Sequence, residues 1–340
     1  MAIAAPAFLI AGAAATDEAA TAIAKNTASD VFALTVSIAL LVSAIIAPII
    51  GTYADITGRR KRLLIIATGI GGLFSSMMFT LQTGSVVLGL GLYFITQIAL
   101  NVALGSNSSL LPHVARQDDM DRVSSLGYAM GYFGGGVLLL VNTALYLFSD
   151  KIGLDSGTAV RIAFLSVGIW WIIFMLPTAR TVPEPPATPL AGGSGKPWRD
   201  SFTRLKHTFQ SARHYEELFK MLIAFWLYSE GIGAIILLAT AYGAALGLST
   251  SVLIGTLLMT QFVAFPYALI YGRIPNPKSE WRSAFVFMLL WTGVTMPVLG
   301  LYANQQGNEA VGIGMAFILI AADQILGALL AITIGRRHFQ

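Results

Sequence analysis

Two carboxylic acids lie in apolar segments that are long enough to cross a membrane. Glu230 is near the middle of Leu218–Leu246, and Asp323 is within Ala310–Ile334. A carboxylate at the centre of a bilayer costs about 2.5–3.5 kcal/mol on insertion scales, so such groups usually face a cavity or a cation. Burial favours the neutral acid, which suits a group that binds and releases protons. The alternative for Glu230 is a structural role, with bonds to Tyr228, Ser229 or Tyr242.

Amide side chains form a second polar set within the apolar segments. Together with Tyr228, they are candidates to line a cavity for an amino or carboxyl group. Single Asn or Gln residues in spans more often bond between helices, and this alternative stays open. A lone His113 at the end of a segment is more simply explained as a capping or packing group. The amide residues are Gln97, Asn101, Asn107 and Asn142.

A basic stretch, Gly51–Arg62, separates the apolar runs Val31–Ile50 and Leu63–Leu81 and reads G-T-Y-A-D-I-T-G-R-R-K-R. Four consecutive cations cannot lie in hydrocarbon, and Lys and Arg beside a span mark its cytoplasmic side. The stretch is therefore predicted to be a short cytoplasmic loop. An ordinary basic loop would explain the cations but not Asp55 or the two glycines. The residues of interest are Gly51, Asp55, Gly58, Arg59 and Arg60.

Three glycines, Gly127, Gly131 and Gly135, recur every four residues in one predicted span. At that spacing they share one helix face, which lets another helix backbone approach closely. The face is either a sliding surface or a static packing surface. The run Gly69–Gly72 lies inside another predicted span with no preceding strand, so we expect it to serve helix packing and not nucleotide binding.

The elements that position these residues are membrane-spanning helices. The 340 residues are 56% hydrophobic and 11% charged, with a mean hydropathy of +0.72, whereas soluble domains carry about 25% charged residues. Alternating segments typical of a β-barrel are absent from the sequence. The sequence also lacks cysteine, a Walker loop, H-E-x-x-H and G-x-S-x-G. We therefore expect no cofactor, metal, nucleic-acid partner, ATP-driven transport or enzyme activity.

Nine full spans are predicted after a polar, extracellular segment at Thr16–Asp30. Met1–Ala15 is predicted to be the partial first helix, because it has only about half of the roughly 20 residues that a span needs. All but three of the 21 Lys and Arg residues fall in predicted cytoplasmic segments, which supports the layout. The spans are Val31–Tyr53, Leu63–Leu81, Val86–Leu111, Val123–Phe148, Ala159–Leu176, Leu218–Leu246, Val252–Tyr271, Trp281–Leu301 and Ala310–Ile334.

A long interruption divides the predicted spans into two bundles. Residues 1–177 form the N-terminal bundle, 178–216 a cytoplasmic linker and 217–340 an incomplete C-terminal bundle. The linker begins Pro- and Gly-rich, which excludes helix there. It continues as a basic amphipathic stretch, Trp198–Arg213, which either lies on the inner membrane face or forms a solvated helix.

The basic loop resembles the G-x-x-x-D-x-x-G-R-R signature of the major facilitator superfamily, although Ile56 replaces a cation that is usual there. Further runs resemble the autophagy-related vacuolar amino-acid effluxer branch and its bacterial relatives, over most of residues 30–272. Asn107 and Ser108 replace Tyr-Asn, and Glu230 replaces Asp. These runs are S-L-L-P-H-V-A at 109–115, D-R-V-S-S-L-G-Y-A-M-G-Y-F-G-G-G at 121–136 and F-W-L-Y-S-E-G at 225–231.

The resemblance implies an all-α, major-facilitator-type two-bundle transporter in a prokaryotic cell membrane. It implies secondary transport of a small polar solute, with amino acids and protons as the candidate solute and coupling ion. The alternative is a non-transporting membrane protein of the same fold, with a lipid-handling or assembly role. Because only four full spans follow the linker, we expect a fragment of a twelve-helix protein.

Overall fold

A computed structural model describes residues 18–212 except Thr83 and Ala191, a few positions between 215 and 223, and residues 250–271. Every regular element in these ranges is helical, as expected for an all-α protein. The long helices are α2 (Glu18–Thr57), α3 (Arg60–Met77), α4 (Val86–Val114), α5 (Met120–Leu147), α6 (Ser156–Thr181), α7 (Pro197–Ala212) and α9 (Thr250–Tyr271). Single 3-10 turns follow three of them, at Met78–Thr80, Gln117–Asp119 and Asp150–Ile152.

Six helices in the described ranges are long and apolar enough to cross a membrane. They correspond to six of the predicted spans, which confirms a multi-pass helical protein. Helix α2 begins at Glu18, so the chain is already helical within the predicted polar segment Thr16–Asp30. The predicted partial helix Met1–Ala15 and the spans Trp281–Leu301 and Ala310–Ile334 lie outside the described residues, as does the span Leu218–Leu246 except for four positions between 219 and 223.

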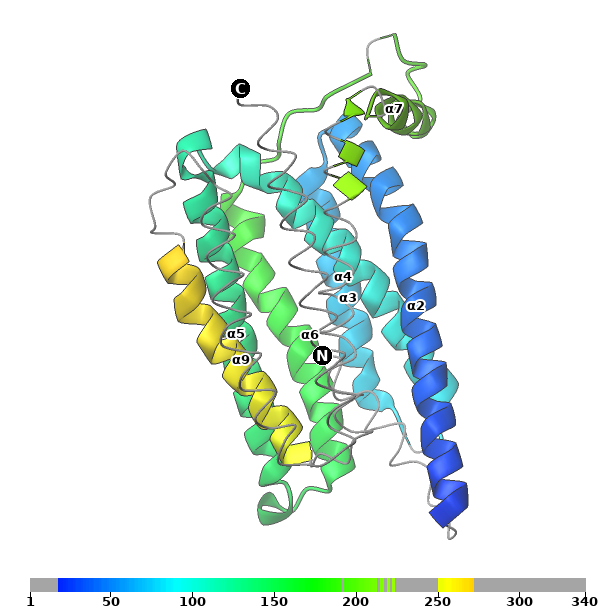
Figure 1. The fold of residues 1–340 in the computed structure, drawn as a ribbon, viewed down its shortest axis with the longest axis vertical. Coiled ribbons are helices and arrows are strands. Elements are labelled where there is room, and N and C mark those ends of the chain that lie inside the picture. The colour runs from blue at the N-terminus through cyan, green and yellow to red at the C-terminus, as the bar shows by residue number, and fades with distance from the viewer. Residues whose placement is uncertain are drawn as a thin grey trace. The chain divides into compact units, whose positions relative to one another are not determined.

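Contacts group the described residues up to His207, together with α9, into one compact unit. Within it, α3 packs between α4 and α6, α2 packs on α4, and α5 packs on α9 and more lightly on α6 (Figure 1). Helix α9, which the sequence places in the C-terminal bundle, therefore contacts a helix of the N-terminal bundle.

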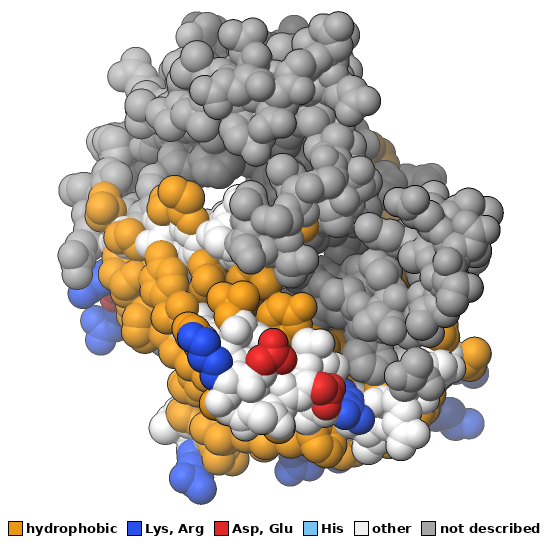
Figure 2. Space-filling view, turned by 90° about the horizontal axis from the view of Figure 1, so that it is seen from below, with side chains coloured by type: hydrophobic (Ala, Val, Ile, Leu, Met, Phe, Trp, Pro, Cys, Tyr) orange, Lys and Arg blue, Asp and Glu red, His pale blue; other side chains and the backbone are white. Residues whose placement is uncertain are grey.

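Many large apolar side chains are exposed, although others, such as Leu64, Leu92 and Phe164, are buried. Leu41 is 63% exposed and Val87 is 86% exposed, whereas Ala39, Ala67 and Ser75 are buried. Hydrophobic side chains line the flank of the described part in the view from below (Figure 2). In a bilayer the surroundings are as apolar as leucine, so close packing of small residues and not hydrophobic burial holds spans together.

Helices α3 and α6 meet through glycines. A Cβ on Gly168 would overlap Ser76 Oγ and the Gly72 carbonyl oxygen, and a Cβ on Gly71 would lie 2.5 Å from the Trp171 ring. Gly71 and Gly72 thus act in packing, as expected for the Gly69–Gly72 run, whereas a Cβ on Gly69 would meet no atom within 4 Å.

The interruption after α6 is shorter than the sequence suggests. Helix α6 continues through Pro177 to Thr181, whose hydroxyl donates to the Pro177 carbonyl at 2.8 Å. Only the segment Val182–Lys196 separates α6 from α7; its described residues are not helical, and we call this segment the linker strap. Its prolines fix the backbone angle φ and lack an N–H, so it cannot form a helix. Helix α7 then starts at Pro197, a residue favoured in the first turn.

Candidate functional site

The turn between α2 and α3 is much shorter than the predicted Gly51–Arg62 loop. Gly51 and Asp55 lie in α2, Arg60 opens α3, and only Gly58 and Arg59 connect the helices. Gly58 has φ +65° and donates to the Asp55 carbonyl at 3.4 Å, while Arg59 N–H donates to Ala54 at 2.8 Å. This is the Schellman arrangement, which ends a helix on a left-handed residue and satisfies its last carbonyls.

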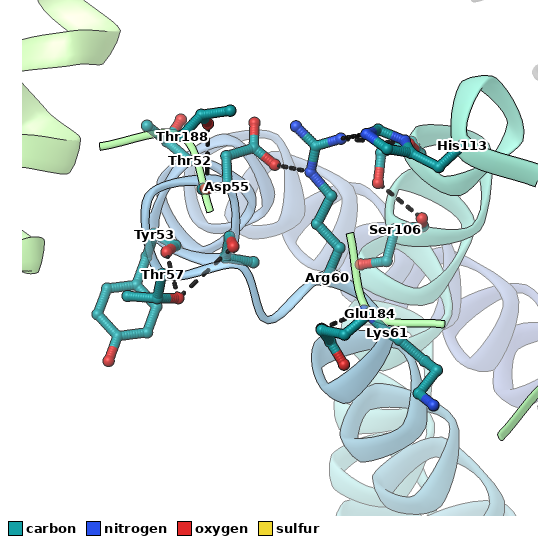
Figure 3. Close-up of polar contacts among 12 residues, drawn as sticks. Thr52, Tyr53, Asp55, Thr57, Arg60, Lys61, Ser106, His113, Glu184 and Thr188 are labelled. Carbon is teal, nitrogen blue, oxygen red and sulfur yellow. Dashed lines mark hydrogen bonds and ion pairs between the residues drawn. The ribbon is translucent and has the colours of Figure 1, made fainter. Parts of the chain in front are cut away.

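Arg60 joins this turn to the end of α4. Its Nε forms an ion pair with Asp55, and its Nη1 lies 3.4 Å from His113 Nε2 and 3.5 Å from the Ser109 carbonyl oxygen (Figure 3). The side chains of Arg60 and Asp55 are 16% and 30% exposed. Two of the five predicted loop residues therefore make one contact, and His113 joins it. Arg59 is exposed, and a Cβ added to Gly51 would meet no atom within 4 Å.

Glu184 of the linker strap supplies the missing cap of α3. Arg59 occupies the N-cap position but makes no capping bond. Instead, Glu184 Oε1 accepts the backbone N–H groups of Lys61 at 2.9 Å and Arg62 at 3.4 Å. A carboxylate is favoured at the positive end of a helix, and here it also offsets adjacent cations. The sequence did not lead us to Glu184. The available signal was that the first turn of α3 contains no acidic residue of its own, so that an acid from elsewhere could cap it.

The linker strap also bonds to the backbone of the turn. Thr188 donates its N–H at 2.9 Å and its hydroxyl at 3.1 Å to the Asp55 carbonyl (Figure 3). Arg204 of α7 donates to the Thr188 carbonyl at 2.6 Å. A Cβ on Gly58 would lie 2.8 Å from Ala187 N, so the close approach of the strap also requires glycine there.

Helix α7 is anchored at its beginning. Its Trp198 ring stacks on Tyr53 of α2, with centroids 4.4 Å apart and an interplanar angle of 22°. Asp200 Oδ1 accepts the Ser194 hydroxyl and N–H, both at 2.7 Å, and these bonds hold the pKa of Asp200 below its usual range. The contribution of Asp200 to stability is thus present above its unfolded pKa and is lost as the pH falls through the folded value.

The predicted amides within the spans make separate interhelical contacts. Asn101 of α4 donates to the Ser43 hydroxyl of α2 at 3.3 Å and to the Gln97 carbonyl at 2.9 Å. Asn142 of α5 accepts from the Ser166 hydroxyl of α6 at 2.9 Å. The bonds to Ser43 and Ser166 match the alternative that single amides link helices, whereas the bond to Gln97 lies within α4. Asn107 is exposed on α4.

The predicted glycine stripe on α5 is open over most of its length. A Cβ on Gly127 or Gly131 would meet no atom within 4 Å, and one on Gly135 would lie 3.9 Å from Gln261 Oε1. Among the glycines of α5, Gly136 comes closest to α9, because a Cβ there would lie 3.2 Å from Gln261 Cβ.

The remaining candidates, Glu230, Tyr228 and Asp323, lie outside the described residues. Within the described ranges, His, Asp and Glu side chains form no group of three that could hold a metal ion. The site that the structure does describe is therefore a polar junction of four parts: the α2–α3 turn, the end of α4, the linker strap and the start of α7.

Known proteins resemble this chain over most of its length. A profile of vacuole effluxer Atg22-like proteins matches residues 19–302. The MFS-type transporter YxiO of Bacillus subtilis, itself described as uncharacterized, is 27% identical over 266 residues, which cover 76% of this chain and 60% of that protein. Autophagy-related protein 22 of Saccharomyces cerevisiae is 24% identical over 322 residues, which cover 81% and 60%.

A shorter match is to autophagy-related protein 22-2 of Aspergillus clavatus, 25% identical over 223 residues, which cover 58% of this chain and 35% of that protein. The chain thus spans 60% or less of the length of these three relatives. No solved structure is significantly similar.

Proposed function

The chain belongs to the vacuole effluxer Atg22-like family, and on that premise we propose that it is a secondary active transporter that moves a small polar solute by alternating access. Amino acids are the substrate class to test first, and a proton gradient is the proposed driving force. Support comes from the names of the relatives, an MFS-type transporter and a family of vacuole effluxers.

The observation that carries the proposal is the Asp55–Arg60 pair and its reach to α4 (Figure 3). Partly exposed ion pairs contribute only about 0–1 kcal/mol, so such a contact can break and reform without unfolding the helices. The contact among Asp55, Arg60 and His113 joins the ends of three spans, α2, α3 and α4, at one face of the bundle. This makes it a suitable element for a transition between two packed states.

Proton coupling is assigned to Glu230, with Asp323 as a second candidate. A carboxyl group within a span is suited to carry a proton because it is far less costly neutral than charged. Solute contacts are assigned to Gln97, Asn101, Asn107 and Tyr228. In this proposal the α2–α3 turn and the linker strap face the cytoplasm, because cations concentrate there.

The test is uptake of a labelled amino-acid mixture by proteoliposomes containing the full chain, with and without a pH gradient. Uptake should require the gradient and should be lost in Glu230→Gln, since the amide mimics only the protonated state. Asp55→Asn should fold but slow uptake by up to about fivefold, because about 1 kcal/mol shifts a two-state population by that factor. Asp118→Asn, an exposed acid on the next cytoplasmic turn, is the matched control.

A folded, monodisperse protein without uptake of any solute would contradict transport and favour a lipid-handling or assembly role. Uptake that is unchanged in Asp55→Asn would remove the junction from the transport cycle. Uptake that is gradient-driven in Glu230→Gln would exclude Glu230 as the coupling group.

A further inference from the structure

Helix α7 carries an apolar stripe that remains about half exposed even though its first residue, Trp198, stacks on Tyr53 of α2. Trp198, Phe202 and Leu205 recur at intervals of four and three residues, so they lie on one helix face. Trp198 is 53% exposed and Phe202 is 55% exposed. With 16 residues, α7 is too short to cross a bilayer, which needs about 20.

The rotation of α7 about its axis is set by contacts on another face. Asp200 and Ser201 are buried, and Arg204 donates to Thr188 of the linker strap. These residues turn one side of the helix toward the protein. The stripe of Trp198 and Phe202 is consequently directed away from the strap.

Measured along the direction of the spans, α7 lies at the level where the membrane surface is expected. Trp198 stacks on Tyr53, which lies four residues before the end of the span Val31–Thr57. At 1.5 Å per residue, this is about 6 Å from the end of the span. Trp and Tyr rings are enriched at this level, where their polar edges meet water and headgroups. Figure 1 shows α7 foreshortened beside the upper end of α2, so its axis crosses the direction of the spans.

Charge around the stripe is positive. Arg199 and Lys206 are exposed and seven residues apart, so they lie on one side of the stripe. The nearby acids are engaged elsewhere: Asp55 with Arg60, Glu184 with the start of α3 and Asp200 with Ser194. Exposed Arg59, Arg62 and Lys196 extend the positive surface.

We propose that α7 is an interfacial helix that binds anionic lipid headgroups through Arg199 and Lys206 and inserts Trp198 and Phe202 at the acyl boundary. An amphipathic helix with cations beside its apolar face lies in the plane of the bilayer surface in this way. The anionic bilayer is the occupant favoured here because the stripe lies at the membrane level and the charges beside it are cationic. This inference is independent of whether the chain transports a solute.

The absence of cysteine makes a site-specific test direct. Phe202→Cys carries a nitroxide label on the stripe, and Thr203→Cys carries one on the neighbouring exposed face as the matched control. The full chain is reconstituted in phosphatidylcholine vesicles with increasing phosphatidylglycerol. The label at position 202 should become accessible to oxygen and shielded from a water-soluble nickel chelate, whereas the label at 203 should stay accessible to the chelate.

Arg199→Gln and Lys206→Gln should each weaken the preference of the labelled site for phosphatidylglycerol by about two- to fivefold, and salt should weaken it further. Arg122→Gln, an exposed cation at the start of α5, should not change it. Equal chelate access at 202 and 203 at all lipid compositions would overturn the proposal. Shielding of position 202 that is the same with and without anionic lipid would also overturn the proposal, and would indicate that another part of the chain covers the stripe. Shielding that depends on protein concentration would overturn it as well, and would indicate a second copy of the chain.

Discussion

At the residue scale, the junction depends on a few positions whose neighbours come from distant parts of the chain. Gly58 combines a left-handed backbone with a close approach of Ala187, and Glu184 caps a helix that begins more than a hundred residues earlier. Each role can be tested with a substitution that removes one interaction and a control that resembles it chemically.

Gly58→Ala should destabilise the α2–α3 turn. The left-handed conformation costs a non-glycine residue about 1–2 kcal/mol, and the added Cβ would lie 2.8 Å from Ala187 N and displace the linker strap. Thermal unfolding in detergent and limited proteolysis of the strap measure the two effects. Gly51→Ala is the control, since its Cβ meets nothing within 4 Å and alanine favours the helix. Equal behaviour of the two variants would disprove the role of Gly58.

Glu184→Ala should loosen the start of α3. Loss of a capping side chain costs about 1 kcal/mol, so the Lys61 and Arg62 amides should exchange hydrogen about fivefold faster. Hydrogen exchange measured by mass spectrometry resolves this segment. Glu216→Ala is the comparison, because the ion pair of Glu216 with Lys220, four residues further on, is exposed. Unchanged exchange at residues 60–63 in Glu184→Ala would show that the cap does not hold α3.

At the element scale, small residues and isolated polar bonds lie at close contacts between spans, in addition to buried large side chains such as Leu92, Leu110 and Phe164. The α3–α6 crossing has glycines on both helices, and α2–α4 and α5–α6 each carry one amide contact. The closeness of each helix crossing indicates where one added methyl group should destabilise the protein.

Gly168→Ala should separate α3 from α6, because the new Cβ would overlap Ser76 Oγ and the Gly72 carbonyl. Overpacking of this kind costs about 1–3 kcal/mol. The expected results are a lower melting temperature in detergent and reduced yield of monodisperse protein. Gly131→Ala on α5 is the matched control, with no atom within 4 Å of the added carbon. A melting temperature of Gly168→Ala equal to that of the control would refute the close crossing.

At the scale of the whole molecule, the distribution of side chains is that of a protein solvated by lipid. Leu34, Leu41 and Ile45 of α2 are all more than half exposed, and the buried positions beside them are Val36, Ala39 and Ser43. The same surface in water would be a large apolar patch, which soluble monomers rarely present.

Leu41→Arg should therefore impair membrane insertion of α2. Leu41 is 63% exposed in the middle of its span, and an arginine at that depth costs about 2.5–3.5 kcal/mol on insertion scales. An in vitro insertion assay of the span measures this directly. Leu41→Ala should insert normally and leave stability nearly unchanged, because little packing is lost. Efficient insertion of Leu41→Arg would mean that this face lines a polar cavity.

Much of the architecture could be predicted because the bilayer imposes it locally. Apolar length and the positions of Lys and Arg predict the six described spans within a few residues. The signature residues Asp55, Gly58 and Arg60 also stand out in the sequence, since a carboxylate and a glycine among cations are unusual. The length of the α2–α3 turn cannot be read from the sequence in this way, because the residue at which a helix ends depends on capping bonds that composition does not reveal.

What the sequence alone determined is thus the class of protein, its six described spans and the chemistry gathered in the α2–α3 turn, because these follow from the solvation of each segment. Only the tertiary structure decided which distant groups meet there. Glu184, Thr188 and Trp198 reach the turn through a proline-rich strap whose path no periodicity encodes. In the same way, Gly168 and not the regularly spaced Gly131 forms a tight helix crossing, because close approach depends on how two helices pack and not on spacing within one.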